Sequence, residues 1–351
     1  MAKKLILKDC IKTAIIRNEY ALRCMNCFYR LKNARYFRKQ VTQRCYLNLF
    51  DYESIAAPLP YYPIESVIEN NYYGLGRTLA KYARLSSPTN SYIEHGIFFG
   101  PNVVPWEQDW KVSNIIVPSF VREQHLREKG IKKNIIVVGP YIHYAKSLLT
   151  DLEYEQTKKT LGKVLLVFPT HSIMNVSVEY DIEHFISFLE SVRSNYDTIL
   201  VCLYWLDALN TSTVEMYRKH GFRIVTAGNR FDPHFLERLK AIIFLADDTI
   251  SNDVGTHVGY CVHLNKSHYI FTQPVSYRAK DVTEEIRLQN SYNKAGKDVE
   301  MYENEVAEVK AAFSSFTPQT ISELQYQVVD KYWGRREIKS SQKLQELLLS
   351  Y

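Results

Sequence analysis

The chain has 351 residues, of which 46% are hydrophobic and 23% charged, with six cysteines and a formal net charge of +6. These values fit a globular protein with two domains of ordinary size, and they exclude a low-complexity or disulfide-scaffold protein. No apolar run approaches the roughly 20 residues of a membrane-spanning helix, and the N-terminus lacks a signal peptide's apolar stretch, so we expect a cytoplasmic protein.

Positive charge is concentrated in residues 1–50, which hold twelve Lys or Arg and two Asp or Glu, whereas the rest holds 32 basic and 36 acidic residues. From Ile11 to about Tyr46, apolar residues recur at helical spacing among the basic ones. The segment predicts a basic amphipathic helix. It either lies peripherally on an anionic membrane, at the inner face of the plasma membrane, or packs on its own domain. We do not expect nucleic acid as a partner, because no recognised nucleic-acid module is present.

After the proline-punctuated stretch APLPYYP, short buried strands alternate with amphipathic helices in two series. The first series predicts strands within 91–100, 114–119 and 133–140. After a break at 140–162, the second predicts strands within 164–172, 197–205, 222–228, 248–252 and 267–272. This alternation predicts parallel βαβ units, and hence an α/β protein with two Rossmann-like domains that face each other across a cleft.

The predicted organisation has four segments. They are a basic helical segment at 1–50, an N-terminal Rossmann-like domain at 51–150, a C-terminal Rossmann-like domain at 151–290, and a helical tail at 291–351 that could cross back to the N-terminal domain. Doubly wound domains bind ligands at the carboxyl ends of their strands. The residues that directly follow each strand are therefore the candidates for a site.

Polar residues follow four strands of the second series. They are Thr170, His171 and Ser172; then Tyr204 and Asp207; then Asn229, Arg230 and Asp232; then Ser251, Asn252, Asp253, Gly255, Thr256 and His257. Hydroxyls, a glycine and a helix N-terminus are typical of a phosphate site. Each residue also has a structural interpretation: Thr256 or Asp253 as a helix cap, His257 as a core histidine, Asp207 as a loop carboxylate or cap. We favour a ligand site because all four strand ends would face one crevice.

Several common catalytic motifs are absent from the sequence. There is no dinucleotide-binding GxGxxG in the required context, no P-loop and no GxSxG nucleophile elbow. Asp247 and Asp248 are adjacent on a strand, so their carboxylates point to opposite faces and would not chelate one metal. Cys24 and Cys27 form a CxxC without a second pair at zinc-like spacing. We therefore expect neither a metal nor a bound cofactor.

Glu94, His95 and Gly96 end the strand within 91–100 of the first series. A histidine at a strand end that faces a cleft can act as a general base, because its pKa lies near neutral pH. The glycine allows the chain to turn and a substrate to approach the backbone. The alternative is a structural histidine beside a turn.

The motifs EHGIFFG, VVGPYIHYA, LLVFPTHS and FLERLKAIIFLADDTISNDVGTHVGYCVHLNKSHYIF, within residues 70–275, together with DKYWG near the tail, resemble those of bacterial GT-B glycosyltransferases. Enzymes of this kind build capsule, O-antigen or lipopolysaccharide. The resemblance implies a metal-independent enzyme whose C-terminal domain binds a nucleotide-sugar donor and whose N-terminal domain binds a glycan or lipid-linked glycan acceptor. It implies His95 as the base, with Glu94 orienting or replacing it.

The same resemblance implies the donor site. The donor phosphate would lie at Thr170, His171, Ser172, Ser251, Asn252, Gly255, Thr256 and His257, with the nucleoside at Asn229, Arg230 and Asp232 and with Tyr204 and Asp207 nearby. Glu237 precedes this region, but no Glu completes the EX7E pattern of many retaining enzymes, so we favour inversion. Two alternatives stay open: a polyol-phosphate transferase with a CDP-linked donor, and a non-catalytic nucleotide- or glycan-binding module.

Overall fold

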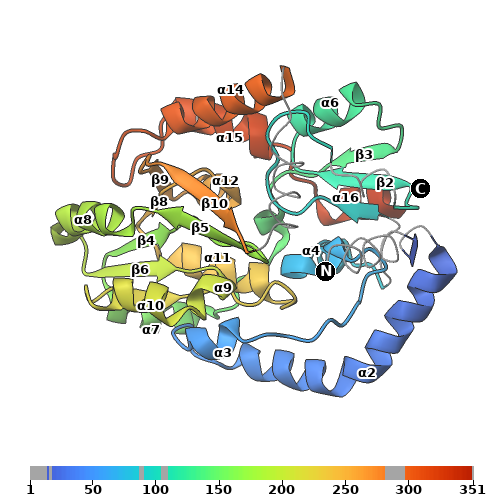
Figure 1. Ribbon diagram of the computed structural model, residues 1–351, viewed down its shortest axis with the longest axis horizontal. Helices are drawn as coiled ribbons and strands as arrows, with labels where there is room; N and C mark the ends of the chain where they lie inside the picture. Colours follow the sequence, from blue (N-terminus) through green and yellow to red (C-terminus); the bar gives the residue numbers. More distant parts are fainter. Residues whose placement is uncertain (1–13, 16–17, 87–90, 104–109, 281–296, 350–351) are drawn as a thin grey trace.

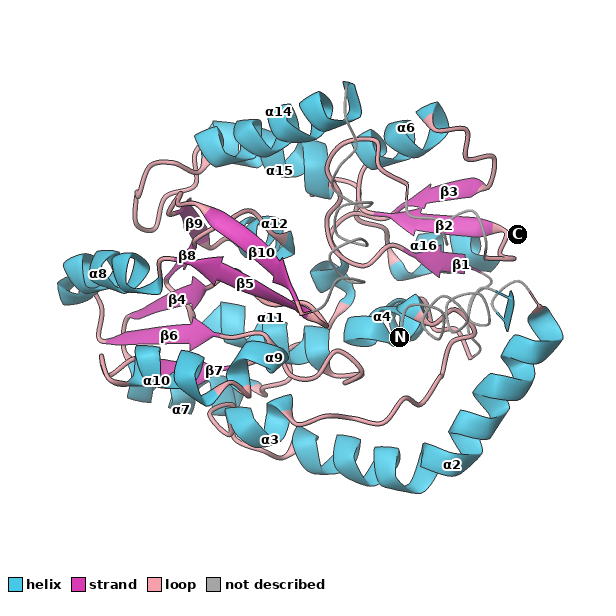
Figure 2. Cartoon of the chain, in the orientation of Figure 1, coloured by secondary structure: helices cyan, strands magenta, loops and turns pink. Residues whose placement is uncertain are grey.

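The computed structural model describes residues 14–15, 18–86, 91–103, 110–280 and 297–349 (Figure 1). Within these residues, two parallel sheets hold most of the strands, and helices pack around both (Figure 2). The structure confirms the predicted α/β class with parallel sheets. The boundaries of the four predicted segments stay predictions.

The larger parallel sheet has five strands and the smaller has three. In spatial order, the larger contains β7 (Arg223–Val225), β6 (Thr198–Cys202), β4 (Val164–Phe168), β8 (Asp248–Ser251) and β9 (Ser267–Ile270), and the smaller contains β1 (Ser91–Ile93), β2 (Asn114–Val117) and β3 (Asn134–Val137). Strands β4 and β2 are buried at every position, as expected for parallel strands that are covered on both faces. All eight strands lie within the predicted stretches.

Helices connect the successive strands. They are α6 (Phe120–Glu128) in the smaller sheet, and α8 (Ile182–Val192) with the 3-10 turn η3 (Arg193–Asn195), α9 (Trp205–Ala208), α10 (Thr211–Arg218), α11 (Phe235–Leu245) and α12 (Thr256–His263) in the larger. The side chains of Ser119, Asp181 and Asn210 accept hydrogen bonds from first-turn amides of α6, α8 and α10. The cap of α10 is therefore Asn210, and the cap interpretation of Asp207 is wrong.

Two features were not predicted from the sequence. The supposed break contains the 3-10 turn η2 (Tyr141–Tyr144) and helix α7 (Asp151–Leu161), which starts with a capping box of Thr150 and Glu153. Strands β5 (Val176–Tyr180) and β10 (Val275–Ala279) form an antiparallel pair. Most of α7 is exposed, so it has little apolar periodicity, and β5 and β10 are distant in the sequence.

The strand order β7-β6-β4-β8-β9 creates a topological switch point between β4 and β8. From β4 the chain continues outward to β6 and β7, and it then returns to the other side of β4 to form β8 and β9. Crevices at the carboxyl ends of strands beside such a point are where open α/β sheets bind ligands. The four polar strand ends predicted from the sequence do belong to one sheet, and two of them border the switch point.

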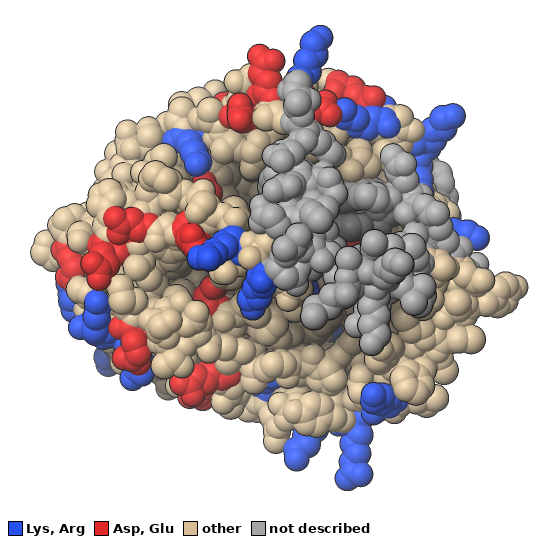
Figure 3. All heavy atoms as spheres, viewed as in Figure 1, with Lys and Arg blue, Asp and Glu red and all other residues tan. Residues whose placement is uncertain are grey.

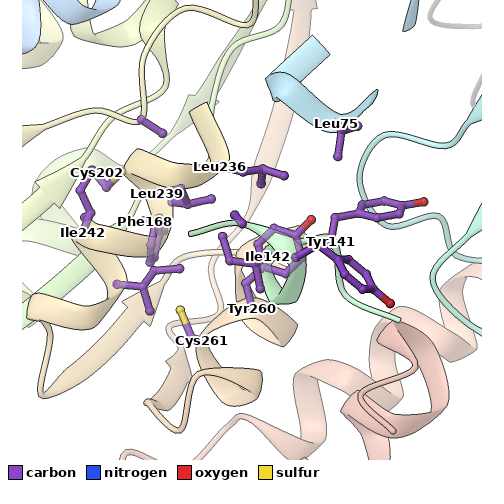
Figure 4. Close-up of a cluster of buried hydrophobic side chains, with 14 of the residues drawn as sticks. Leu75, Tyr141, Ile142, Phe168, Cys202, Leu236, Leu239, Ile242, Tyr260 and Cys261 are labelled. Carbon is purple, nitrogen blue, oxygen red and sulfur yellow. The ribbon is translucent and has the colours of Figure 1, made fainter. Parts of the chain in front are cut away.

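One cluster of buried apolar side chains includes residues from both parallel sheets. It contains Ile93 and Ile116 of the smaller sheet, Leu166 and Phe168 of β4, and residues of α11 and α12 (Figure 4). Burial of apolar area at roughly 25 cal/mol per Å² makes such a cluster a main source of stability. The two sheets are thus joined by packed side chains rather than by a linker alone.

A long helix precedes the smaller sheet. Helix α2 (Glu19–Cys45) runs along one edge of the molecule, and Leu22 packs with Tyr92 and Ile115 of the smaller sheet (Figure 1). Helix α3 (Tyr52–Ala56), the 3-10 turn η1 (Glu69–Gly74) and helix α4 (Leu75–Tyr82) follow before β1. None of the described helices combines the length and apolarity required to cross a bilayer.

The C-terminal tail forms α14 (Lys297–Ala312), α15 (Glu323–Trp333) and α16 (Ser341–Leu349). The tail forms hydrogen bonds with α12 and with α4. Trp333 Nε1 donates to the carbonyl of Thr256 at 3.1 Å, and Ser341 Oγ donates to the carbonyl of Tyr82 at 2.6 Å. The tail thereby connects α12 to α4.

Candidate functional site

Asn252 lies at the switch point, directly after β8. Its Oδ1 accepts hydrogen bonds from the backbone amide of Thr170 at 2.6 Å and from the Thr170 hydroxyl at 2.9 Å, which ties the end of β8 to the end of β4. The residue is 1% exposed, and its Nδ2 has no hydrogen-bond partner in the described part of the chain. An enclosed amide without a partner costs free energy, which a ligand that accepts a hydrogen bond would recover.

His257 lies in the first turn of α12, the helix that follows β8. Its ring stacks on Phe168 with a centroid distance of 4.8 Å and an interplanar angle of 16°. Burial, with the nearby His171, lowers the pKa of His257 to about 3, so the ring is neutral at pH 7. Its Nε2 is enclosed without a hydrogen-bond partner among the described residues. His257 and Asn252 therefore offer two unused nitrogen atoms at the switch point.

Helix α12 begins without a side-chain cap. Gly255 occupies the N-cap position, so the interpretation of Thr256 or Asp253 as the cap is wrong. Asp253 instead forms an ion pair with Lys310 at 2.8 Å. The Thr256 hydroxyl accepts a hydrogen bond from the backbone amide of Ile97 at 3.0 Å. Among the described residues, no side chain caps the N-terminal amides of α12, whereas Thr256 joins α12 to the turn that follows β1.

Two predicted phosphate ligands have other partners. Ser251 Oγ donates to the carbonyl of Asp253 at 2.7 Å and contacts His268 Nε2 at 3.0 Å. Ser172 Oγ accepts from the amide of Val178 at 3.3 Å. Both hydroxyls are therefore engaged in shaping their own loops. Of these partners, only His268 of β9 comes from another segment of the chain.

The loop after β4 is held by Asp207, whose Oδ2 accepts from the amide of Ser172 at 3.0 Å. Burial raises the pKa of this carboxyl. His171 is exposed, and its ring lies 4.3 Å from that of Tyr204. The Tyr204 hydroxyl in turn contacts the Tyr73 hydroxyl at 3.2 Å. His171 and Tyr204 together form an aromatic surface beside the switch point.

His95 follows β1, and Gly96 after it turns the chain with a φ of +93°. A Cβ added to Gly96 would lie 3.2 Å from Thr256 Oγ1. The His95 ring contacts Tyr72 edge-on at 5.4 Å, and its Nδ1 is enclosed without a hydrogen-bond partner among the described residues. Burial lowers the pKa of His95 to about 4; Glu94 opposes this shift and Arg230 adds to it. The imidazole is therefore neutral at pH 7 and able to accept a proton.

Glu94 does not share the surroundings of His95. It is fully buried, and its carboxylate accepts from Arg122 of α6, Oε2 from Nε at 3.0 Å and Oε1 from Nη2 at 2.5 Å. A carboxylate held in this bidentate way is a poor base, because protonating it would leave a buried guanidinium unpaired. The prediction that Glu94 could replace His95 is therefore not supported by the structure.

Of the three predicted residues after β7, Arg230 is a candidate for ligand binding, whereas Asn229 and Asp232 have structural partners. Asn229 Oδ1 accepts from the amide of Phe231 at 3.0 Å, and Asp232 forms an ion pair of 3.0 Å with Arg238 in which both side chains are fully buried. Both side chains therefore hold the loop after β7, Asp232 by its bond to α11. The Arg230 guanidinium lies over the rings of Tyr72 and Phe231, at 4.9 and 5.0 Å.

The structure thus gathers some of the predicted residues and adds others. His95 and Arg230 both contact Tyr72, Asn252 directly follows β8, and His257 lies in the first turn of the helix after it. Tyr72 and Phe231 were missed, although consecutive tyrosines before a glycine in NNYYGLGR were a visible signal. In the described residues, no cluster of three His, Cys, Asp or Glu side chains has the arrangement of a metal site.

No protein-family model and no curated protein matches the sequence. Solved structures are similar at low identity. The wall teichoic acid polymerase TagF has a TM-score of 0.40 and 15% identity, over 74% of this chain and 67% of its own. The UDP-GlcNAc 2-epimerase of Neisseria meningitidis bound to UDP-GlcNAc has a TM-score of 0.36 and 12% identity, over 80% and 88%. The S. aureus MnaA–UDP structure has 0.37 and 13%, over 77% and 68%. Similarity of this degree assigns no role to a residue.

Proposed function

We propose that the protein is a metal-independent glycosyltransferase of the GT-B type, which moves a sugar from a nucleotide-sugar donor to a growing surface glycan or its lipid-linked precursor. The observation that carries the proposal is a group of enclosed nitrogen atoms without partners among the described residues. They belong to Asn252, His257, Arg230 and His95. Such nitrogen atoms, beside the uncapped N-terminus of α12, suit the phosphates of a nucleotide sugar.

In this proposal His95 is the base of an inverting reaction. The acceptor oxygen attacks the anomeric carbon, its proton passes to the imidazole, and the bond from that carbon to the phosphate oxygen breaks with its electrons on the phosphate. A base with a pKa of about 4 is weak. The donor phosphate would strengthen it, since a nearby negative charge favours the imidazolium form. Arg230 and the dipole of α12 would stabilise the charge on the departing phosphate.

We also propose that α2 brings the enzyme to an anionic membrane, where a lipid-linked acceptor would lie. Tyr20, Phe28 and Leu31 are 81%, 58% and 80% exposed on this helix. Exposed Lys and Arg side chains lie among them, and they project from the edge of the molecule that α2 forms (Figure 3). Apolar groups surrounded by basic ones are typical of helices that lie in the headgroup region.

The donor is tested by thermal shift and mass spectrometry of the full chain with UDP-, GDP- and CMP-sugars and CDP-linked polyols. We expect one nucleotide class to raise the Tm and to be consumed. Asn252→Asp keeps the acceptor for Thr170 but removes the amide donor, so it should abolish the shift; Asn210→Asp, at a surface cap, should keep it. A polyol-phosphate product would favour the alternative transferase, binding without turnover a binding module, and no shift with any nucleotide would refute the proposal.

A further inference from the structure

The turn after β1, residues 95–100 with the sequence HGIFFG, is attached at two points to helices from the C-terminal part of the chain. The Ile97 amide donates to Oγ1 of Thr256 in α12 at 3.0 Å, and the Gly100 amide donates to Oε2 of Glu305 in α14 at 2.6 Å. The partners are separated by 159 and 205 residues in the sequence. The turn that carries His95 is therefore held by elements outside its own sheet.

The second glycine of the turn allows α14 to come close. Gly100 has a φ of +64°, and a Cβ there would lie 3.0 Å from the Cβ of Tyr302 in α14. As at Gly96, a side chain would be strained by the positive φ and would press on the neighbouring helix. The two glycines of HGIFFG thus correspond to two close contacts, Gly96 with α12 and Gly100 with α14.

Apolar packing joins the same elements. Phe99 is buried in a cluster with Val258 of α12, Val309 of α14 and Trp333 of α15. Its ring contacts that of Trp333 edge-on, with a centroid distance of 5.9 Å. The turn therefore packs on the three helices through a side chain as well as through its backbone amides.

Helix α14 is fixed in turn to both sides of the candidate site. Glu305 is 9% exposed, and its second carboxylate oxygen lies 3.0 Å from Nε2 of His125 in α6. One and a half turns further along α14, Lys310 forms the ion pair with Asp253, which precedes α12. The position of the turn relative to the N-terminus of α12 is thus set by Thr256 directly and by Glu305 through α14.

We propose that Thr256 and Glu305 are positioning residues, which fix His95 with respect to the N-terminus of α12. Thr256 is the first residue of that helix, and the residue it holds, Ile97, is two positions after His95. A base and the phosphate that leaves the same carbon must be held at a defined separation, and a change of about 1 Å can lower the rate about 10²-fold. This role in the reaction rests on the proposed function. The attachment of the turn to α12 and α14 does not.

The attachment is tested by hydrogen exchange, measured by mass spectrometry on the full chain without nucleotide. Thr256→Val keeps the shape of the side chain but removes the acceptor, so the Ile97 amide should exchange about tenfold faster or more. Thr256→Ser keeps a hydroxyl and should exchange like wild type. Thr150→Val, which removes a hydroxyl acceptor at the cap of α7, is the matched control and should leave residues 95–100 unchanged. Exchange in the buried strand β4 reports global unfolding and should be equal in all four proteins.

The same comparison is made at the second point of attachment. Glu305→Gln keeps a side-chain oxygen for the Gly100 amide, whereas Glu305→Leu removes it. We expect faster exchange of Gly100 in the Leu variant alone. This pair of variants also keeps the inference testable if a substitution at Thr256 prevents folding.

The kinetic test uses the donor and acceptor found by the donor screen. Thr256→Val should lower kcat about 10²-fold and leave the KM for the donor within about threefold, because the base is displaced while the phosphate site is intact. Thr256→Ser should restore kcat. A side chain that only stabilises the fold would lower the Tm without this division between kcat and KM.

Four results decide the inference. Wild-type exchange of Ile97 in Thr256→Val, or fast exchange in Thr256→Ser as well, would overturn the attachment. A kcat of Thr256→Val close to that of wild type would overturn the positioning role, and so would a raised donor KM with unchanged kcat, which would place the hydroxyl on the donor. If the exchange results are as expected but wild type turns over no donor, the proposed function alone is refuted.

Discussion

His95 and Glu94 are adjacent in the chain but have opposite surroundings. The Glu94 carboxylate is neutralised by Arg122 beside the smaller sheet, whereas His95 lies among aromatic rings with a nitrogen to which no described residue forms a hydrogen bond. Alternation along an extended segment places successive side chains on opposite faces, which explains the separation. The pairing of Glu94 with Arg122 depends on α6, so the sequence could not reveal it.

Replacing His95 by Ala should lower kcat by about 10²–10⁴-fold while the nucleotide-induced rise in Tm is retained, because a general base contributes to the reaction and little to donor binding. Both are measured on the substrates found by the donor screen. Glu94→Gln is the contrasting variant: it leaves Arg122 buried and unpaired, so it should lower stability by about 3–5 kcal/mol. Loss of nucleotide binding in His95→Ala, or activity within tenfold of wild type, would remove His95 from the base role.

At the scale of elements, α2 shows what periodicity can and cannot decide. The apolar face that the sequence displays, with Leu22 and Met25 on α2, packs against the protein's own core, as does Ile15 ahead of the helix. A second set, Tyr20 and Leu31 among them, is exposed instead. Hydropathy marks both sets as apolar, and only the packing of α2 against the smaller sheet tells them apart. The two interpretations of the helix are thus compatible: one face packs on the protein, and the other is free to lie on a membrane.

The variant Phe28→Ser/Leu31→Ser tests the exposed face of α2. If that face enters a membrane, co-sedimentation with vesicles that contain 30% phosphatidylglycerol should fall at least fivefold, since about 2–3 kcal/mol of burial is lost for each side chain. Leu152→Ser, at a 68% exposed position of α7, is the matched control and should sediment like wild type. Equal sedimentation of all three proteins would mean that the exposed face of α2 does not bind the membrane and that the helix is only structural. Removing residues 1–50 would be a poorer test, because Leu22 belongs to the core.

At the scale of the whole molecule, the sequence predicts what depends on one segment at a time. The runs that form β4 and β8 are continuous and apolar, so the strands were located correctly, and parallel pairing brought Thr170 and Asn252 together. The partners of Thr256 and Asp232 were not predicted. The Thr256 hydroxyl accepts from the amide of Ile97, a partner from a distant segment that follows from tertiary packing alone, and Asp232 pairs with Arg238, six residues further along the chain.

The protein as a whole should be acid-labile because five histidines have lowered pKa values caused first by burial. They are His95 and His263 at about 4, His257 at about 3, and His143 and His268 below the ordinary value. The unfolded chain protonates these groups near pH 6.5, but the folded chain does not. Their contribution is therefore fully present above pH 6.5 and is lost as pH falls toward 4.

Three groups work in the other direction, one of them Asp207, whose pKa burial raises. The raised pKa of Glu65 favours folding at low pH, and in His234 burial is outweighed by hydrogen bonds to Cys45 and Glu237 that raise the pKa to about 9. Five histidines at up to about 1.4 kcal/mol per pH unit each should still dominate below pH 6.5. Urea unfolding at pH 7.5, 6.5, 5.5 and 4.5 should show a free energy of unfolding that falls steeply over the last two steps. In His257→Gln the slope should be shallower by about 1.4 kcal/mol per unit. A free energy that stays flat down to pH 4.5 would mean that these histidines are solvated rather than buried.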